Sequence, residues 1–568
     1  MIFRLLITLT FIISLHPLSS ATIINIPADY PTIQQGIDAS ADGDTVLVQP
    51  GTYVENINFN GHNIVLGSLF LITGDTSYIE QTVIDGGAQG CVLTLTSGED
   101  STTVITGLKI QNGSGYIFGA GILCRPASPQ IIKNIICNNN SGGMGGGICS
   151  YSGLIISGNV VYNNHAHTDG GGIFVAGNNL LVESNIIFDN SGGLDYTSVG
   201  GGMLVAGSGL VKNNIIYNNG GTNGGGLGCG GDSLYIINNI IIYNRTSDGW
   251  PAVTCHSYGS DSVFIKNCIL WNNSASELYH GGSGFLDASY NVIRDGYPGT
   301  GNLSDHPLLL DPLHNNFNVC SQSPCIDAGD PNIYDPDSTR SDIGLFFPEH
   351  PDCFAGNTWN VSMAGNDTTG NGSPGNPFRT VQHAVDVSLH GDSILVDNGT
   401  YIENIEIFFK NIIIMSNYIY SGQFEDIEST ILDGDSLSAV AHFVFTDSMA
   451  AIKGFTITNG GASGVSCHFA EPVISGNIIK ENYSMDWGGG GIFCSGYCNP
   501  TINSNIIVFN KSTPWGGGIY CAGPNPDIIS NTISGNSPSG IEVSGDYSGS
   551  ISNSIIWANS PREINVHG

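Results

Sequence analysis

The chain repeats a short phrase, in which an Asn precedes a few apolar residues and a second Asn, at intervals of 22 to 29 residues. One unit reads GGGIFVAGNNLLVESNIIFDN (residues 170–190), and its glycine run and asparagine phrase recur along most of the sequence. The first series of phrases begins at Asn134, Asn159, Asn185, Asn214, Asn239 and Asn267, and the second at Asn477, Asn505, Asn531 and Asn553. A period of this length indicates a solenoid, in which each repeat forms one coil.

The residue types indicate which kind of solenoid forms. Ile, Val, Tyr and Phe dominate the apolar runs, while Asn and the 79 Gly residues punctuate them, which favours strands and tight turns over helices. Stacked coils then pair about 4.8 Å apart, so the sequence predicts an all-β parallel β-helix. We expect Asn to occupy left-handed corner positions and to stack on its counterparts in neighbouring coils through its amide.

The pattern is duplicated on a larger scale. TIQQGIDASADGDTVLVQPGTYVENI from Thr32 matches TVQHAVDVSLHGDSILVDNGTYIENI from Thr380, an offset of 348 residues. Each copy opens with apolar residues at helical i, i+4 spacing, which predicts a short helix that caps the open end of the coil stack. We therefore expect one domain at 22–344 with a closing segment at 306–344, a linker at 345–360, and a second domain at 361–568, truncated before its closing segment.

Six cysteines share one position in the repeat, two residues after the apolar residue that follows the glycine corner. They are Cys124, Cys229, Cys255, Cys467, Cys494 and Cys521. This register predicts a buried column of small side chains, although the coil spacing also permits disulfides. Cys320/Cys325 and Cys494/Cys498 are alternative bridges, and metal binding is not expected because no CxxC or His-rich spacing accompanies these cysteines.

The N-terminus predicts export. MIFRLLITLTFIISL places one Arg before an apolar run that is too short to span a bilayer, and small residues follow as far as Ala21. This pattern predicts a signal peptide at 1–21, and no later apolar run is long enough for a membrane span. Acidic residues outnumber basic ones 48 to 15, for a formal net charge of -33. Such a chain repels nucleic acid but remains open to neutral glycans, protein partners and Ca²⁺.

Several longer segments resemble a known superfamily. DYPTIQQGIDAS and GDTVLVQPGTYVENI resemble the N-terminal coil of the pectin lyase-like superfamily, SMAGNDTTGNGSPGNPFRTVQHAVD resembles the opening of exported bacterial β-helix domains, and SPCIDAGDP with RSDIG resembles their closing segment. The resemblance covers nearly all of the mature length and implies a right-handed parallel β-helix. It does not imply one activity, and the catalytic signatures of the superfamily's polygalacturonases, pectin methylesterases and mannuronan epimerases do not occur in the sequence.

The loops between each corner Asn and its glycine run vary while their frame repeats, so a site is expected there. In copy one these loops contain His165, His167, Asp169, Asp195, Arg245 and Asp248. Two His and two Asp can bind a metal, and two carboxylates can serve glycoside hydrolysis. The alternative is that they are solvated loop residues.

Aromatic residues precede some of the glycine runs. Asp486, Trp487 and Trp515 do so in copy two, and Trp250 lies in the same register of copy one. We expect Trp487 and Trp515 one coil apart on the same side, where the indoles stack on sugar rings or on each other.

The closing segment contains DPDSTRSD (335–342), a third candidate. Asp335, Asp337 and Asp342 can bind Ca²⁺ together with backbone oxygens. The alternative is that these aspartates only shape a closing turn.

Together these features predict an exported scaffold, secreted or at the cell surface, that binds a polysaccharide or another glycan. One alternative is a polysaccharide lyase or glycoside hydrolase that uses the loops of copy one. Another is an adhesin for a host or cell-surface protein, since the short repeat resembles that of chlamydial polymorphic outer-membrane proteins.

Overall fold

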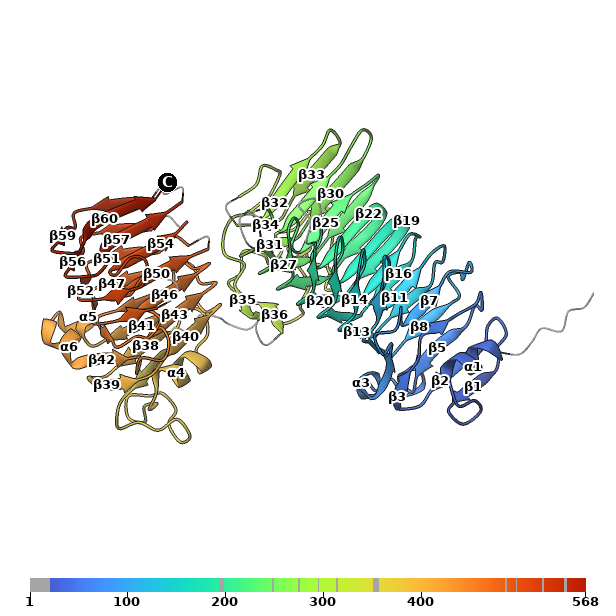
Figure 1. Cartoon of the computed structure of the whole chain (residues 1–568), viewed down its shortest axis with the longest axis horizontal. Helices are drawn as coiled ribbons and strands as arrows, with labels where there is room; N and C mark the ends of the chain where they lie inside the picture. The colour runs from blue at the N-terminus through green and yellow to red at the C-terminus, as the bar shows by residue number, and fades with distance from the viewer. Residues whose placement is uncertain are drawn as a thin grey trace, which may run out of the picture.

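The chain folds into two stacks of β-coils (Figure 1). A computed structural model describes residues 21–193, 199–247, 250–273, 276–294, 296–312, 315–350, 357–485, 488–496, 498–523, 526–545 and 549–567. The first solenoid runs from β1 (Ile23–Ile26) to β34 (Val292–Ile293), and the second from β37 (Thr358–Val361) to β60 (Arg562–His567). Each strand pairs in parallel with its counterparts in the coils before and after it, so the predicted right-handed parallel β-helix is confirmed.

The coils of the first solenoid contribute strands to sheets that run along its length. A 10-stranded sheet extends from β3 (Gly51–Val54) to β34. An 18-stranded sheet joins two ladders, because β19 (Ile173–Glu183) and β22 (Met203–Lys212) are long enough to belong to both. A third sheet of two-residue strands runs from β10 (Ser114–Gly115) to β28 (Arg245–Thr246).

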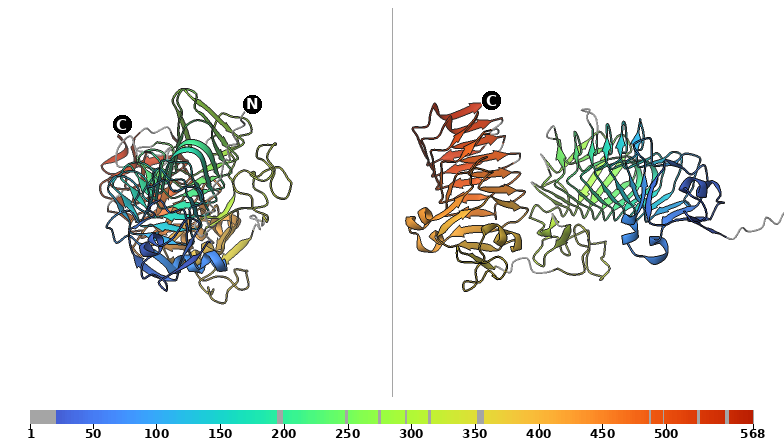
Figure 2. Two further views of the ribbon diagram at one scale, coloured as in Figure 1. Left: turned by 90° about the vertical axis from the view of Figure 1, so that its right-hand side faces the viewer. Right: turned by 60° about the horizontal axis from the view of Figure 1, so that its bottom comes forward.

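The second solenoid has three main faces. An 8-stranded sheet runs from β37 to β58 (Ser550–Ser552), a 7-stranded sheet from β39 (Gly399–Ile402) to β59 (Ile555–Trp557), and another 7-stranded sheet from β40 (Ile405–Phe408) to β60. A minor sheet pairs β49 (Tyr483–Ser484) with β53 (Lys511–Ser512). Figure 2 shows that this stack grows in a direction steeply inclined to the first.

Asparagine ladders hold the coils in register, as predicted. In each ladder one Asn Nδ2 donates to the Asn Oδ1 of the next coil at 2.9–3.1 Å. The ladders consist of Asn134, Asn159, Asn185, Asn214 and Asn239; Asn139, Asn164, Asn190, Asn219, Asn244 and Asn273; Asn477, Asn505 and Asn531; and Asn482, Asn510, Asn536 and Asn559. These amides are buried, so the ladder satisfies polar groups that water cannot reach.

The left-handed corner does not lie where the sequence pattern placed it. The positive φ belongs to the residue before the ladder Asn, for example Lys133 at 53° and Ser184 at 56°. In two coils the first asparagine of the repeated phrase is itself the left-handed corner residue. These are Asn267 and Asn553, with φ of 53° and 51°. The ladder position is then filled by the following residue, Cys268 in the first case and Ser554 in the second.

A short helix caps the start of each solenoid, as the i, i+4 pattern predicts. They are α1 (Ile33–Asp38) and α4 (Val381–Val387), with Thr32 and Thr380 as N-caps. A carboxylate from the next turn of the chain accepts the first two backbone N–H groups of each helix, Glu55 for α1 and Glu403 for α4, at 2.9–3.0 Å. Helix N-termini favour such anionic acceptors.

The remaining helices are also duplicated. α2 (Phe70–Thr73) and α3 (Ser77–Gln81) form an excursion in the first solenoid, and α5 (Tyr418–Ser421) and α6 (Phe424–Ser429) form the same excursion in the second. No helix in the described part of the chain is long and apolar enough to cross a membrane.

The segment that follows the first solenoid packs along the side of its last coils and reaches the second solenoid. It contains the antiparallel pair β35 (Leu309–Asp311) and β36 (Asn316–Val319). At the junction, the ring centroids of Tyr243 and Phe409 lie 3.9 Å apart, and His306 Nε2 lies 3.5 Å from Asp447 Oδ2. The two solenoids therefore share an aromatic contact as well as a covalent connection.

The shared cysteine position is buried, as predicted. Cys229 and Cys255 form a disulfide with a Cα–Cα distance of 4.8 Å. Cys325 is a free thiol, and so are Cys494 and Cys498. The alternative bridges Cys320/Cys325 and Cys494/Cys498 are therefore not formed.

Candidate functional site

A groove of about 800 Å³ runs across the outer face of four neighbouring strands of the second solenoid. The strands are β43 (Ala441–Val444), β46 (Val465–His468), β50 (Ile492–Ser495) and β54 (Ile519–Ala522). Side chains alternate between core and surface along each strand, so the residues on either side of the buried Cys467, Cys494 and Cys521 face outward. Strand register aligns these outward residues into two rows that line the groove.

Aromatic rings form one wall of the groove. Phe493 and Tyr520 are register partners, and their ring centroids lie 5.9 Å apart with planes inclined by 18°. Trp515 stacks beside Tyr520 at 6.1 Å with an angle of 26°, and it remains 43% exposed. Trp515 and Tyr520 belong to one coil and Phe493 to the coil before it, and each neighbouring pair of rings is inclined by 26° or less.

The backbone at Trp515 is firmly held. Its carbonyl accepts from Gly489 N at 3.0 Å and from the Ser512 hydroxyl. The buried carboxylate of Glu542 accepts from Gly516 N at 2.8 Å. The exposed indole therefore projects from a fixed corner, which limits the conformational entropy that ligand binding would cost.

Imidazoles and hydroxyls form the rest of the lining. His468 Nδ1 lies 2.8 Å from Ser495 Oγ, and burial, with smaller contributions from Arg245 and His442, lowers the pKa of His468 to about 4. Burial also lowers the pKa of His442, against the opposing charge of Glu406. Both rings are therefore neutral at pH 7, and each offers one donor and one acceptor.

The groove also contains an unsatisfied hydroxyl. Ser463 is fully buried, and its Oγ has no hydrogen-bond partner among the described residues. No Lys, Arg, Asp or Glu is among the described residues that line the groove. The lining therefore combines apolar faces with neutral hydrogen-bonding groups.

Trp515 is a predicted aromatic residue that lines this groove, and Trp250 is not among the described residues that do. Trp250 is 39% exposed on the first solenoid, where it meets Tyr279 edge-on at 5.5 Å. Asp486 and Trp487 lie outside the described residues, so the expected pairing of Trp487 with Trp515 stays a prediction.

The structure places the predicted residues of copy one at separate points. His165 lies on β18 (His165–Ala166), where its Nδ1 is 2.9 Å from Ser191 Oγ, and Arg245 lies on β28 of the same sheet. Three strand steps separate β18 from β28, which corresponds to about 14 Å. This separation is too long for the two side chains to act on one atom.

Two further residues of that set follow β18. Asp169 accepts from Val199 N at 2.7 Å, and burial raises the pKa of this carboxyl. His167 is exposed. Asp195 and Asp248 lie outside the described residues. The described members of the set do not gather at metal-ligand spacing, and their catalytic role stays a prediction.

The aspartates proposed for Ca²⁺ bind backbone groups of the closing segment. Asp335 Oδ2 accepts from Asp342 N at 2.7 Å, and Asp337 Oδ1 accepts from Thr339 N at 2.9 Å. Asp342 Oδ1 accepts from Asp327 N at 2.9 Å, and burial raises the pKa of Asp342 to about 6. In the described part of the chain these carboxylates do not converge at metal-ligand spacing.

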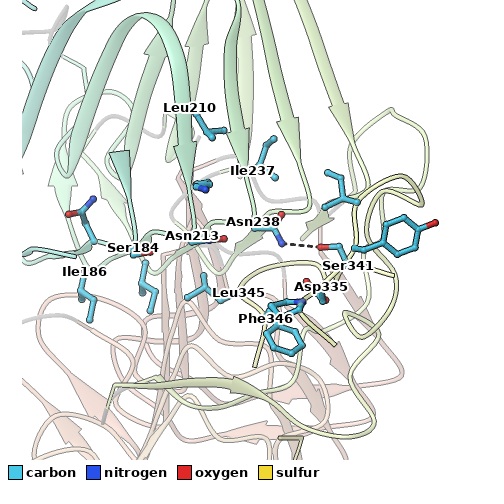
Figure 3. Close-up of a pocket in the computed structure, with 16 residues that line it drawn as sticks. Ser184, Ile186, Leu210, Asn213, Ile237, Asn238, Asp335, Ser341, Leu345 and Phe346 are labelled. Carbon is cyan, nitrogen blue, oxygen red and sulfur yellow. Dashed lines mark hydrogen bonds between the residues drawn. The ribbon is translucent and has the colours of Figure 1, made fainter. Parts of the chain in front are cut away.

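Asp335 also lines a cleft of about 710 Å³ between the coils of the first solenoid and the closing segment. Figure 3 shows Leu345 and Phe346 at this cleft and Asn238 pointing toward Ser341, to which it donates at 3.2 Å. Asn238 Nδ2 also donates to Gly344 O at 2.9 Å, so this part of the lining holds the closing segment against the coils.

The residues that the sequence interpretation missed were marked by a signal it did not use. His442, His468, Phe493 and Tyr520 flank core positions of the repeat, so strand alternation alone puts them on the outer face. Of these, Phe493 and Tyr520 each precede a column cysteine directly.

The stacked coils, the parallel register and the asparagine ladders decide the fold. The chain is a right-handed parallel β-helix protein. A family model described as a protein of unknown function (DUF1565) matches residues 363–566, which lie within the second solenoid. None of the curated proteins matches the sequence.

Two kinds of solved structure resemble the chain. A mutant of the PL6 family alginate lyase AlyGC is 11% identical, with 96% of this chain and 98% of that chain covered and a TM-score of 0.30. The pectate lyase Pel9A is 14% identical, with 59% of this chain and 97% of that chain covered and a TM-score of 0.32. Likenesses this distant assign no activity to this chain.

Proposed function

We propose that the protein is an exported scaffold, secreted or at the cell surface, whose second solenoid binds a neutral glycan in the groove over β43, β46, β50 and β54. Export rests on the leader-like sequence at 1–21. Glycan binding rests on the groove itself.

The observation that carries the proposal is the alignment of Trp515, Tyr520 and Phe493 on neighbouring coils. Carbohydrate rings present apolar C–H faces, which pack on aromatic rings, while their hydroxyls need both donors and acceptors. The neutral imidazoles of His442 and His468 and the hydroxyl of Ser495 supply both. A pocket with aromatic walls and a few placed polar groups is typical of small-molecule and sugar sites.

Charge favours a neutral rather than an acidic glycan. The described lining contains no basic side chain, and carboxylates lie one coil beyond each end, Glu406 next to His442 and Glu542 next to Tyr520. The whole chain carries a formal charge of -33. A polyanionic sugar would be repelled unless cations bridged it.

A glycan-array screen tests the proposal, with and without Ca²⁺, followed by a product assay on each hit. We expect wild type to retain neutral glycans, Trp515→Ala and Phe493→Ala to weaken that binding, and Trp250→Ala on the first solenoid to leave it unchanged. Binding that Trp515→Ala and Phe493→Ala do not alter would reject the groove as the site.

A second function, cleavage of a polysaccharide by elimination or hydrolysis, is favoured by one observation. His468 is a neutral imidazole, hence a candidate general base, and Arg245 of the first solenoid is close enough to act on its pKa. Elimination from a uronate needs such a base together with a cation near the developing charge. Unsaturated sugar ends that appear with wild type and vanish with His468→Ala would establish a lyase. Binding without any product would instead support a binding scaffold.

A further inference from the structure

Three thiols meet in the core of the second solenoid. Cys467 on β46 and Cys494 on β50 are register partners in neighbouring coils, and Cys498 follows β50 in the same coil. The three sulfur atoms all lie within 4.8 Å of one another, and all three residues are fully buried. Among the His, Cys, Asp and Glu side chains of the described residues, these three form the group whose ligand atoms lie close enough together to hold a metal ion.

The surroundings give these thiols few other partners. Cys498 Sγ donates to Ala470 O at 2.7 Å. The hydrogen bonds that act on Cys494 come from other thiols, and thiols are weak donors and acceptors. The neighbouring core is apolar, with Val465, Ile492 and Ile519 among its members. Three soft ligands therefore face one another within the apolar core of the second solenoid.

We propose that Cys467, Cys494 and Cys498 bind one Cu(I) ion through three thiolate sulfurs. Thiolate ligands select soft ions such as Cu(I), and three sulfurs in mutual contact suit a three-coordinate ion. Zn²⁺ in structural sites takes four ligands, and the next thiol along the ladder, Cys521, does not belong to the compact group. The arrangement therefore favours copper over zinc.

Binding is a proton exchange, not a redox step. Each thiol that becomes a ligand releases its proton to solvent, and copper stays Cu(I) throughout. Since the site is closed in the folded coil, the ion would enter while the coils assemble.

A disulfide is the rival state. Cys229 and Cys255 occupy neighbouring coils in the same register relation and are already bridged. Oxidation of Cys494 with Cys467 or Cys498 would remove two protons and two electrons to an external oxidant and would leave too few thiols for the ion. Copper binding and a disulfide within the group therefore exclude each other.

The test expresses the full chain with copper, purifies it anaerobically under a thiol reductant, and measures copper per chain after gel filtration against a weak chelator. We expect one Cu(I) per chain in wild type, with sulfur-to-copper charge-transfer absorption. Cys467→Ser and Cys498→Ser should lose the ion, while Cys521→Ser and Cys325→Ser, two buried thiols outside the group, should retain it.

Circular dichroism checks that each variant is folded, and Cys498→Ala provides an apolar replacement if a serine disturbs the core. Wild type without copper would overturn the proposal. Equal retention by Cys467→Ser and Cys498→Ser would overturn it too, as would loss of copper from Cys521→Ser. A peptide map of reductant-free protein that shows a disulfide within the group would favour the rival state.

Discussion

Asn510 in the second solenoid allows a direct test of the ladders. Its Nδ2 donates to Ile479 O at 2.9 Å and to Asn536 Oδ1 at 3.1 Å, and its Oδ1 accepts from Asn482 N and Nδ2 at 3.0 Å each. Asn510→Ala leaves the buried backbone N–H of Asn482 without an acceptor and removes the donor to Ile479 O, whereas Asn482 Nδ2 keeps two backbone acceptors. The orphaned N–H costs about 1–3 kcal/mol and the lost hydrogen bond about 0.5–1.5 kcal/mol, so we expect a loss of about 3 kcal/mol.

Hydrogen exchange is the suitable assay, because a solenoid unfolds locally and a single global transition cannot be assumed. A loss of about 3 kcal/mol raises the population of the open state more than about a hundredfold. We expect amides of β48 (Ile478–Lys480) and β49 to exchange faster by that factor, while amides of the first solenoid keep their protection.

Asn499→Ala is the matched control. Asn499 is exposed in the same solenoid and, among the described residues, donates to the Glu471 carboxylate at 3.1 Å. Its replacement should change the local free energy of unfolding by less than about 0.5 kcal/mol. The reasoning is refuted if Asn510→Ala and Asn499→Ala change exchange rates equally.

Three further predictions concern the cap, the closing segment and the disulfide. Glu403→Ala removes the acceptor of two N–H groups of α4, so hydrogen exchange of the α4 amides should show a loss of about 1–2 kcal/mol in the local free energy of opening; no loss would contradict this capping role. Because burial raises the folded pKa of Asp342 to about 6, the folded state holds this proton more tightly than the unfolded state. This carboxyl should therefore lower the stability of the folded state as pH rises from about 4 to 6, and Asp342→Asn should remove that contribution of about 1–2 kcal/mol; parallel pH profiles of wild type and Asp342→Asn would contradict it. Peptide mapping without reductant should recover Cys229 linked to Cys255, and two free thiols there would contradict the structure.

Much of the fold follows from the sequence because a solenoid repeats its local rules. The period, the buried cysteine position and the helix from Val381 to Val387 each reflect one coil and its neighbour. At Asn267 the predicted ladder position was wrong by one residue, because a left-handed corner Asn and a ladder Asn cannot be distinguished in the sequence. Only the hydrogen bond from Asn239 N to Cys268 Sγ shows which residue occupies the ladder.

The site was harder to predict because its residues come from different coils. Trp515 was recognisable from its place before a glycine run. His468 and Phe493 were not, since nothing local marks an outward residue as part of a groove. Conversely, His165 and Arg245 look close in the repeat pattern, but each intervening coil adds about 4.8 Å. The thiols of Cys467 and Cys498 meet for the same reason: stacking joins positions that are distant in sequence.

The most direct test of the central claim is the affinity of wild type and Trp515→Ala for a neutral glycan retained in the screen. Trp515 is 43% exposed, which corresponds to about 100 Å² of an indole side chain. A sugar that covers half of this area gains about 1.3 kcal/mol. We predict that Trp515→Ala raises Kd about tenfold, and that Trp250→Ala leaves it unchanged. An unchanged Kd for Trp515→Ala, or no neutral glycan bound by wild type, would contradict the account.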